Sequence, residues 1–181
     1  MKLLLHTCCA PCAIYPVESL RDQRFEVTGF FFRNNIHPYS ECLKREKTLA
    51  DYAEKIHLPV VYPNGYDLEG YLRKIIFHEK DRCAICYQNR LSETASMAKT
   101  LGFDCFTSTL LYSKFQKHDV IKKIGESIAV SSGIPFYYQD FREGWKYGVD
   151  VSRQLNMYRQ QYCGCIYSEK DRFYKKASHL I

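Results

Sequence analysis

The residues in this sequence that are best suited to metal binding or redox chemistry are its cysteines, most of which fall into three groups. The first group is Cys8, Cys9 and Cys12, three thiols within five positions. The second group is Cys83 and Cys86, whose spacing places two thiols on one side of a helical turn. Four thiolates from these two groups suit either a tetrahedral zinc ion or an iron–sulfur cluster. The spacing therefore predicts a metal or cluster site.

The third group is Cys163 and Cys165, which are separated by a single glycine. A disulfide between such close residues is strained, and strained disulfides are the easily reduced, catalytic kind. A redox-active pair is one interpretation, and additional metal ligands or two free thiols in a tight turn are the others. The remaining cysteines, Cys42 and Cys105, are predicted to be small core residues.

Short apolar strands alternate with amphipathic helices along the chain. Strands are predicted at residues 2–7, 25–32, 59–62, 104–111 and 135–139. Helices are predicted at 11–22, 40–57, 67–77, 83–101 and 120–133, followed by a helical C-terminal part with helices at 149–160 and from Ser168 onward. The alternation predicts an α/β fold with an open, mainly parallel five-stranded sheet flanked by helices.

The predicted sheet also indicates where a functional site would lie. Open parallel sheets bind ligands beyond the carboxyl ends of their strands. The first cysteine group follows the first strand, and polar segments at 34–38, 113–119 and 140–145 follow the second, fourth and fifth strands. We therefore expect sulfur and polar groups to converge on one edge of the sheet.

Composition limits the class of protein. The 181-residue chain is 46% hydrophobic, enough for one well-buried core, so we expect a single domain over residues 1–181. The apolar start is too short for a signal peptide, and no apolar stretch approaches a membrane span. We expect a cytoplasmic monomer with no membrane partner, in which nine cysteines point to metal or redox chemistry. The net charge of +6 fits an anionic partner such as RNA, although the basic residues form no block.

The order of the motifs resembles that of the QueH family of epoxyqueuosine reductases. The hallmark of that family stands here as His6-Thr7-Cys8-Cys9-Ala10-Pro11-Cys12. Further matching segments are 35–38, 82–87, 107–111, 140–145 and 158–165, so the resemblance covers nearly the whole chain. One departure is Arg33-Asn34-Asn35, where the family pattern suggests a Tyr-Asn-Pro-Asn-like turn.

The resemblance implies a HUP-like, Rossmann-like α/β fold with a [4Fe–4S] cluster and an additional mononuclear iron beside it. It implies two-electron deoxygenation of epoxyqueuosine to queuosine at the wobble position of tRNA, the last step of queuosine biosynthesis, with electrons from a donor protein. Carried onto this sequence, the cluster ligands would be Cys8, Cys9, Cys83 and Cys86. The resemblance makes Cys163 and Cys165 a disulfide-forming pair and Cys12 the candidate ligand of the second iron.

Epoxide removal also needs protons and a way to hold the RNA. His37, His118 and Tyr138 are candidate proton donors, with structural hydrogen bonds as the alternative for each. Candidates for phosphate contacts are Lys114, Lys117, His118, Arg142, Lys146, Arg153 and Arg159, and candidates for stacking on an extruded base are Phe115, Phe141 and Trp145. A solvated basic rim with core aromatics is the alternative for these sets.

Other functions explain part of the same pattern. The segment Cys9-Ala10-Pro11-Cys12 between a strand and a helix is typical of thiol–disulfide oxidoreductases, but that function leaves Cys8, Cys83 and Cys86 unused. A zinc-stabilised RNA-binding module would use the same four thiols structurally and would be colourless. An ATP-dependent tRNA-modifying enzyme of similar fold would need a glycine-rich phosphate loop, and this chain has cysteines after its first strand.

Overall fold

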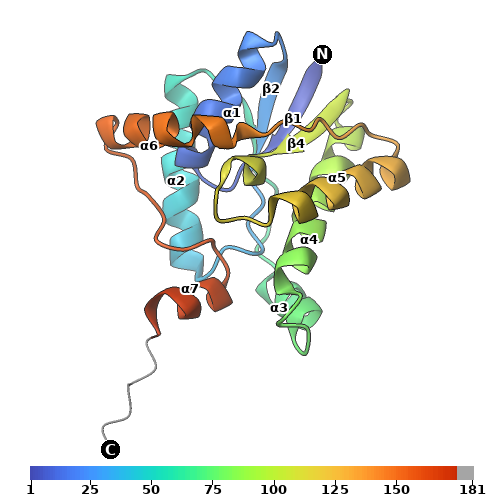
Figure 1. Ribbon diagram of the computed structural model, residues 1–181, viewed down its shortest axis with the longest axis vertical. Coiled ribbons are helices and arrows are strands. Elements are labelled where there is room, and N and C mark those ends of the chain that lie inside the picture. Colours follow the sequence, from blue (N-terminus) through green and yellow to red (C-terminus); the bar gives the residue numbers. More distant parts are fainter. Residues whose placement is uncertain (175–181) are drawn as a thin grey trace, which may run out of the picture.

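A computed structural model describes residues 1–174 and has a parallel sheet flanked by helices, as the sequence predicts (Figure 1). The sheet contains β1 (Lys2–His6), β2 (Glu26–Phe30), β3 (Val60–Val61) and β4 (Cys105–Ser108). The strands lie in the order β3-β2-β1-β4, and every neighbouring pair is parallel. The central strand β1 is an apolar run whose Leu3, Leu4 and Leu5 are fully buried, as expected for a strand covered on both faces.

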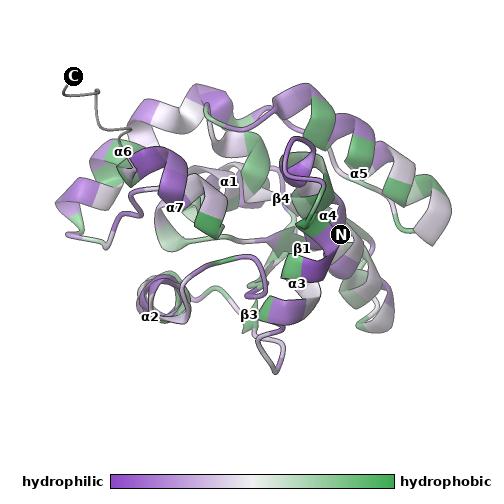
Figure 2. Ribbon diagram, turned by 90° about the horizontal axis from the view of Figure 1, so that it is seen from below, coloured by the Kyte–Doolittle hydropathy of each residue, from purple (hydrophilic) through white to green (hydrophobic). Residues whose placement is uncertain are grey.

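Helices pack on the two sides of the sheet (Figure 1). On one side α1 (Ala10–Asp22) packs against α2 (Tyr39–Lys55) and α6 (Trp145–Gln154), and on the other α4 (Arg82–Thr100) packs against α5 (His118–Ser132). The shorter α3 (Leu68–Ile75) contacts α4, and α7 (Ile166–Phe173) is the last described helix. In Figure 2, α5 carries alternating apolar and polar bands, as expected for a helix with one face on the core. No helix within residues 1–174 is both long and apolar enough to span a membrane.

The prediction of a fifth strand at residues 135–139 is wrong. This segment makes one isolated parallel bridge, between Phe136 and Phe106. The Phe106 N–H donates to the Pro135 carbonyl, and the Tyr137 N–H donates back to the Phe106 carbonyl. Pro135 has no N–H to extend the ladder toward residue 134, and residues 135–139 form no strand, so the sheet has four strands.

The boundaries of other predicted elements also differ. The predicted fourth strand continued to residue 111, but β4 ends at Ser108 because its hydroxyl accepts from the Leu110 N–H and starts the 3₁₀ helix η1 (Thr109–Tyr112). Helix α6 begins at Trp145 rather than near 149, directly after the 3₁₀ helix η2 (Phe141–Gly144), and ends at Gln154. Helix α7 begins after Cys165, earlier than Ser168. The HUP-like classification stays a prediction.

Candidate functional site

The first cysteine group lies at the end of β1, the strand from which later strands are added on both sides. Strands β2 and β3 extend the sheet on one side of β1, whereas β4 lies on the other side. The loops that follow β1 and β4 therefore leave a crevice beyond the strand ends. Cys8 and Cys9 lie in the loop after β1, and Cys12 lies in the first turn of α1. The sequence pattern predicted this position.

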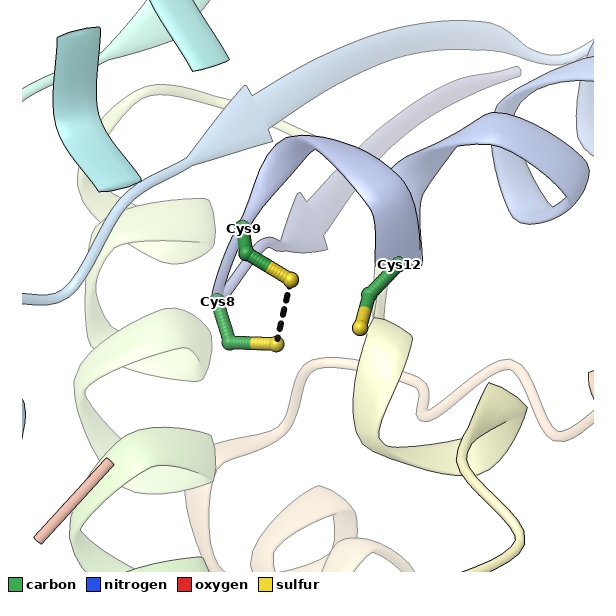
Figure 3. Close-up of side chains that lie close together, drawn as sticks. All are labelled: Cys8, Cys9 and Cys12. Atoms are coloured by element: carbon green, nitrogen blue, oxygen red, sulfur yellow. Dashed lines mark hydrogen bonds between the residues drawn. The ribbon is translucent and has the colours of Figure 1, made fainter. Parts of the chain in front are cut away.

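The Sγ atoms of Cys8, Cys9 and Cys12 all lie within 4.8 Å of one another, and all three residues are buried. Figure 3 shows their side chains turned toward a common point, and the Cys8 and Cys9 Sγ atoms are 3.7 Å apart. Hydrogen bonds from the Cys12 and Cys9 thiols hold the pKa of Cys8 well below its usual value. Burial raises the pKa of Cys9, and the bond to Cys8 raises that of Cys12. Hydrogen bonds from the Cys9 and Cys12 thiols therefore favour the thiolate form of Cys8.

A buried arginine on α4, Arg90, lies near Cys8. The Nη1 of Arg90 donates to His6 Nε2 at 3.2 Å, and His6 Nδ1 then donates to Ser108 Oγ at 2.8 Å. Burial, with the nearby Arg90 charge, lowers the pKa of His6 to about 3, so this histidine is neutral. Burial acts to lower the pKa of Arg90 itself, but the charges of Cys86 and Cys8 raise it overall. One guanidinium therefore acts on both the first and the second cysteine group.

The second cysteine group lies at the start of α4 and is not part of the compact group of three sulfurs. The buried Cys86 accepts a hydrogen bond from Asn35 Nδ2, with 3.0 Å between nitrogen and sulfur. Cys83 is half-buried, and burial raises the pKa of its thiol. Cys86 packs with Tyr71 in a small apolar cluster that also contacts Cys165. The second and third cysteine groups therefore meet around Cys86.

The third cysteine group is held by a buried ion pair on α2. Arg45 Nε donates to Glu41 Oε1 at 2.7 Å, while its Nη1 and Nη2 donate to the carbonyls of Cys163 and Tyr162 at 2.8 and 3.0 Å. The Arg45 side chain is fully buried. Gly164 adopts a φ of 153° with Arg45 Nη1 close by, a conformation that suits glycine. The tight turn predicted at this position is therefore anchored to α2.

The two thiols of this turn have different surroundings. Gln116 Nε2 donates to Cys163 Sγ at 3.3 Å, and the Cys163 side chain is exposed. Cys165 Sγ donates to Ser168 Oγ at 3.7 Å. Both cysteines are free thiols in the structure. Their proposed redox pairing stays a prediction.

A cavity of about 700 Å³ opens onto the cysteine groups. Its lining includes thiols from two groups, an aromatic wall, and polar residues of the C-terminal segment: Cys8, Cys12, Arg90, Thr109, Tyr112, Phe115, Gln116, Trp145, Arg159, Gln160, Tyr162, Cys163 and Arg172. Such a volume is typical of sites for small molecules or single nucleosides. The thiols therefore lie at a position that a substrate could reach.

The three candidate proton donors do not line this cavity. His37 uses both ring nitrogens, since Nδ1 accepts from the Ile166 N–H at 3.3 Å and Nε2 donates to the Asn34 carbonyl at 3.0 Å. His118 Nε2 lies 3.0 Å from the Tyr138 hydroxyl, at the start of α5. Their role in proton transfer stays a prediction.

The residues predicted to contact RNA differ in exposure and in their position relative to the cavity. Phe141 is completely buried, whereas Phe115 is 84% exposed. Of the basic candidates, only Arg159 lines the cavity. Sequence reasoning assigned no role to Arg90 or Gln160, although Gln160 lies within the matched segment 158–165 and Arg90 follows the matched segment 82–87 closely. Their signal was a polar side chain a few residues from a cysteine, which in sequence resembles any surface residue.

The buried thiols after β1, the buried guanidinium of Arg90 and the cavity together define an α/β protein with a candidate metal or redox centre. Comparison with known proteins makes this class specific. The model of the family described as epoxyqueuosine reductase QueH matches residues 3–171. The chain therefore belongs to the epoxyqueuosine reductase QueH family, and it is an oxidoreductase.

Curated relatives agree with this assignment. An epoxyqueuosine reductase QueH of Dehalococcoides mccartyi is 34% identical, with 98% of this chain and 97% of the relative covered. The Thermotoga maritima protein of the same name is 36% identical, with coverage of 97% and 94%. The Streptococcus pyogenes protein is 32% identical over 93% of this chain and 71% of its own length. The family match spans the positions of all three cysteine groups.

Proposed function

We propose that this protein is an epoxyqueuosine reductase that converts epoxyqueuosine in tRNA to queuosine. The observation that carries the proposal is the compact group of buried sulfur atoms of Cys8, Cys9 and Cys12 beside a 700 Å³ cavity. Removing the epoxide oxygen as water consumes two electrons and two protons and leaves a carbon–carbon double bond. Apart from a pair of thiols, side chains cannot supply two electrons, so a metal centre or a dithiol is required.

The residues present fit a [4Fe–4S] cluster held by Cys8, Cys9, Cys83 and Cys86. All four ligand atoms would be thiolate sulfurs, and the charge of Arg90 acts on both thiol groups, which would offset the negative charge of a buried cluster. When bound, the metal centre would supply electrons and, through a second iron with Cys12 as candidate ligand, a Lewis acid. Cys12 lines the cavity, which supports its assignment to the position nearest the substrate.

The third cysteine group gives the site a second source of reducing equivalents. If Cys163 and Cys165 join as a disulfide, they release two electrons and two protons, the number that the reaction consumes. Cys163 lines the cavity and accepts a hydrogen bond from Gln116, which would stabilise its thiolate. A donor protein would then reduce the disulfide for the next turnover.

Protons are proposed to come from His37, His118 or Tyr138. Of these, His37 is connected to the third cysteine group, because its backbone N–H donates to the Gly164 carbonyl at 2.7 Å. A tRNA substrate and a thiol-dependent site both suit a cytoplasmic enzyme.

The metal and sulfide content of protein purified without oxygen tests the proposal. We expect iron and acid-labile sulfide in the proportion of a cluster, lost in Cys83→Ala and Cys86→Ala but retained in the buried control Cys105→Ala. We also expect wild-type protein to form queuosine from epoxyqueuosine-containing tRNA. Zinc without sulfide would favour a structural RNA-binding module, and metal-free protein with thiol-exchange activity would favour a thiol–disulfide oxidoreductase. Full iron and turnover in Cys83→Ala would make the cluster assignment wrong.

A further inference from the structure

One wall of the cavity consists of aromatic side chains that become progressively more exposed. Tyr112 is 2% exposed, Trp145 is half-buried, and Phe115 is 84% exposed. The ring centroids of Tyr112 and Trp145 are 5.2 Å apart, and those of Phe115 and Trp145 are 5.5 Å apart. The wall therefore runs from the buried end of the cavity to solvent, with Phe115 at the solvent end.

The Phe115 ring is held in place without being covered. It meets Trp145 at an interplanar angle of 80°, an edge-to-face arrangement that cannot cover both of its faces. Its backbone N–H donates to Ser113 Oγ at 3.3 Å, and the Gln116 N–H donates to the Ser113 carbonyl at 3.3 Å. A large apolar ring that is fixed yet exposed is an available stacking surface.

The charge around this wall favours an anionic ligand. Arg159 and Arg172 line the cavity, and neither forms an ion pair with a residue of the described chain. Asp171 also lines it, but its carboxylate pairs with Arg82 at 2.6 Å. The cavity therefore carries unpaired positive charge beside an exposed aromatic ring. This combination is how proteins bind single-stranded nucleic acid, with aromatic rings under bases and cations near phosphates.

We propose that Phe115 stacks on the nucleobase next to the modified nucleotide of the RNA, while Arg159 binds a phosphate of the same strand. The inference rests on the proposed function and deepens it. The modified nucleotide must reach Cys8 and Cys12 inside the cavity, so it cannot remain at the solvent-exposed Phe115. The neighbouring nucleotide lies at the cavity mouth, where Phe115 provides an open ring face.

The single tryptophan of the chain is the reporter for this contact. Because Trp145 is the only tryptophan and its ring contacts Phe115, RNA binding at the mouth should change its fluorescence. The probe is an unmodified tRNA anticodon stem–loop, titrated against wild type, Phe115→Ala and Phe77→Ala. Phe77 is the matched control, since it is 91% exposed but lies outside the cavity. Thermal unfolding of each variant verifies that it is folded.

We expect Phe115→Ala to weaken stem–loop binding by about 5- to 150-fold, the usual effect of losing one base–aromatic stack, and Phe77→Ala to bind as wild type does. In Arg159→Gln the slope of log affinity against log salt should decrease by about 0.7–0.9, the contribution of one phosphate contact. Equal binding by wild type and Phe115→Ala, or no binding by wild type, would overturn the stacking.

Turnover separates this inference from the proposed function. If the protein reduces epoxyqueuosine in tRNA, Phe115→Ala should raise KM and leave kcat nearly unchanged, because Phe115 holds a base that does not react. Turnover with an unchanged KM in Phe115→Ala would reject the stacking and keep the reductase. Absent turnover with a Phe115-dependent affinity for the stem–loop would reject the reductase and keep the RNA contact.

Discussion

The side-chain amide of Gln160 donates to the Cys9 sulfur at a distance of 2.9 Å, across 151 positions of sequence. The same nitrogen lies 3.5 Å from Cys12 Sγ. At the second cysteine group, Asn35 donates to Cys86 Sγ at 3.0 Å. Hydrogen bonds of this kind stabilise the reduced, more negative form of a thiolate-bound centre and so raise its reduction potential. Neutral amides thus surround the thiols that the proposed cluster needs.

The first prediction concerns this amide. In Gln160→Met, which keeps the length of the side chain but removes the donor, we expect the reduction potential of the metal centre to fall by tens of millivolts, on the order of one lost hydrogen bond. A redox titration followed by electron paramagnetic resonance measures it. Gln88→Met is the control, because Gln88 is exposed on α4. Equal potentials in the two variants would show that the Gln160 amide does not tune the centre.

The second prediction concerns the buried ion pair of Arg45 and Glu41. Arg45→Met leaves the Glu41 carboxylate buried without its cation, and we expect a loss of about 3–5 kcal/mol in the free energy of unfolding. Urea denaturation measures it. Adding Glu41→Gln should recover part of the loss, since the double variant no longer buries an unpaired charge. No recovery in the double variant would assign the loss to packing instead.

A second ion pair, between Arg33 and Glu46 of α2, is the control for this prediction. Arg33 and Glu46 are 2.6 Å apart, but their side chains are 16% and 24% exposed. Partial hydration reduces the effect of pairing, so Arg33→Met should cost clearly less than Arg45→Met. A comparable loss in the two variants would indicate that burial does not determine the effect.

The sequence predicted those parts of the fold and site that depend on local patterns. The buried run in β1 and the cysteines directly after it placed the first thiol group at the sheet edge, where the structure has it. The strand prediction for residues 135–139 was wrong, although the local pattern is strand-like. A strand also needs a partner to pair with, and this segment, with Pro135 lacking an N–H donor, forms only one bridge to β4. Tertiary pairing of this kind is absent from local sequence.

The same reason explains the missed residues. Arg90 and Gln160 matter because the fold brings each beside a residue that is distant in sequence. Arg90 contacts His6, 84 positions away, and Gln160 contacts the Cys9 thiol, 151 positions away. No periodicity or spacing encodes such contacts. Cys8 and Cys12, in contrast, are four positions apart on one strand-to-helix connection, so their proximity followed from the sequence.

The third prediction concerns pH. Burial is the main cause that lowers the pKa of His118, and its Nδ1 has no hydrogen-bond partner within the described chain. As pH falls below about 6.5, the unfolded state binds the proton more readily than the folded state, so stability decreases. We expect His118→Gln to reduce the difference in unfolding free energy between pH 7.5 and 5.5. Urea denaturation at both values measures it, with exposed His78→Gln as control. An unchanged pH dependence in His118→Gln would contradict the assignment.

The fourth prediction concerns the turn between Cys163 and Cys165. A Cβ at Gly164 would lie 3.3 Å from Arg45 Nη1 and 3.4 Å from the Asn35 carbonyl oxygen, at a φ of 153°. Gly164→Ala should therefore strain the backbone and also push the turn away from Arg45. We expect a lower unfolding free energy and faster labelling of Cys163 by thiol reagents, because the turn that holds this residue becomes less fixed.

Gly133 supplies the control that separates the two causes. It also has a positive φ, 74°, but a Cβ there would meet nothing within 4 Å. Gly133→Ala should cost only the backbone strain of about 1–2 kcal/mol and leave the labelling rate of Cys163 unchanged. If Gly164→Ala lost no more stability than Gly133→Ala and labelled at the wild-type rate, the contact with Arg45 would not hold the turn. A faster rate in Gly164→Ala alone would show that α2 sets the reactivity of the third cysteine group through Arg45.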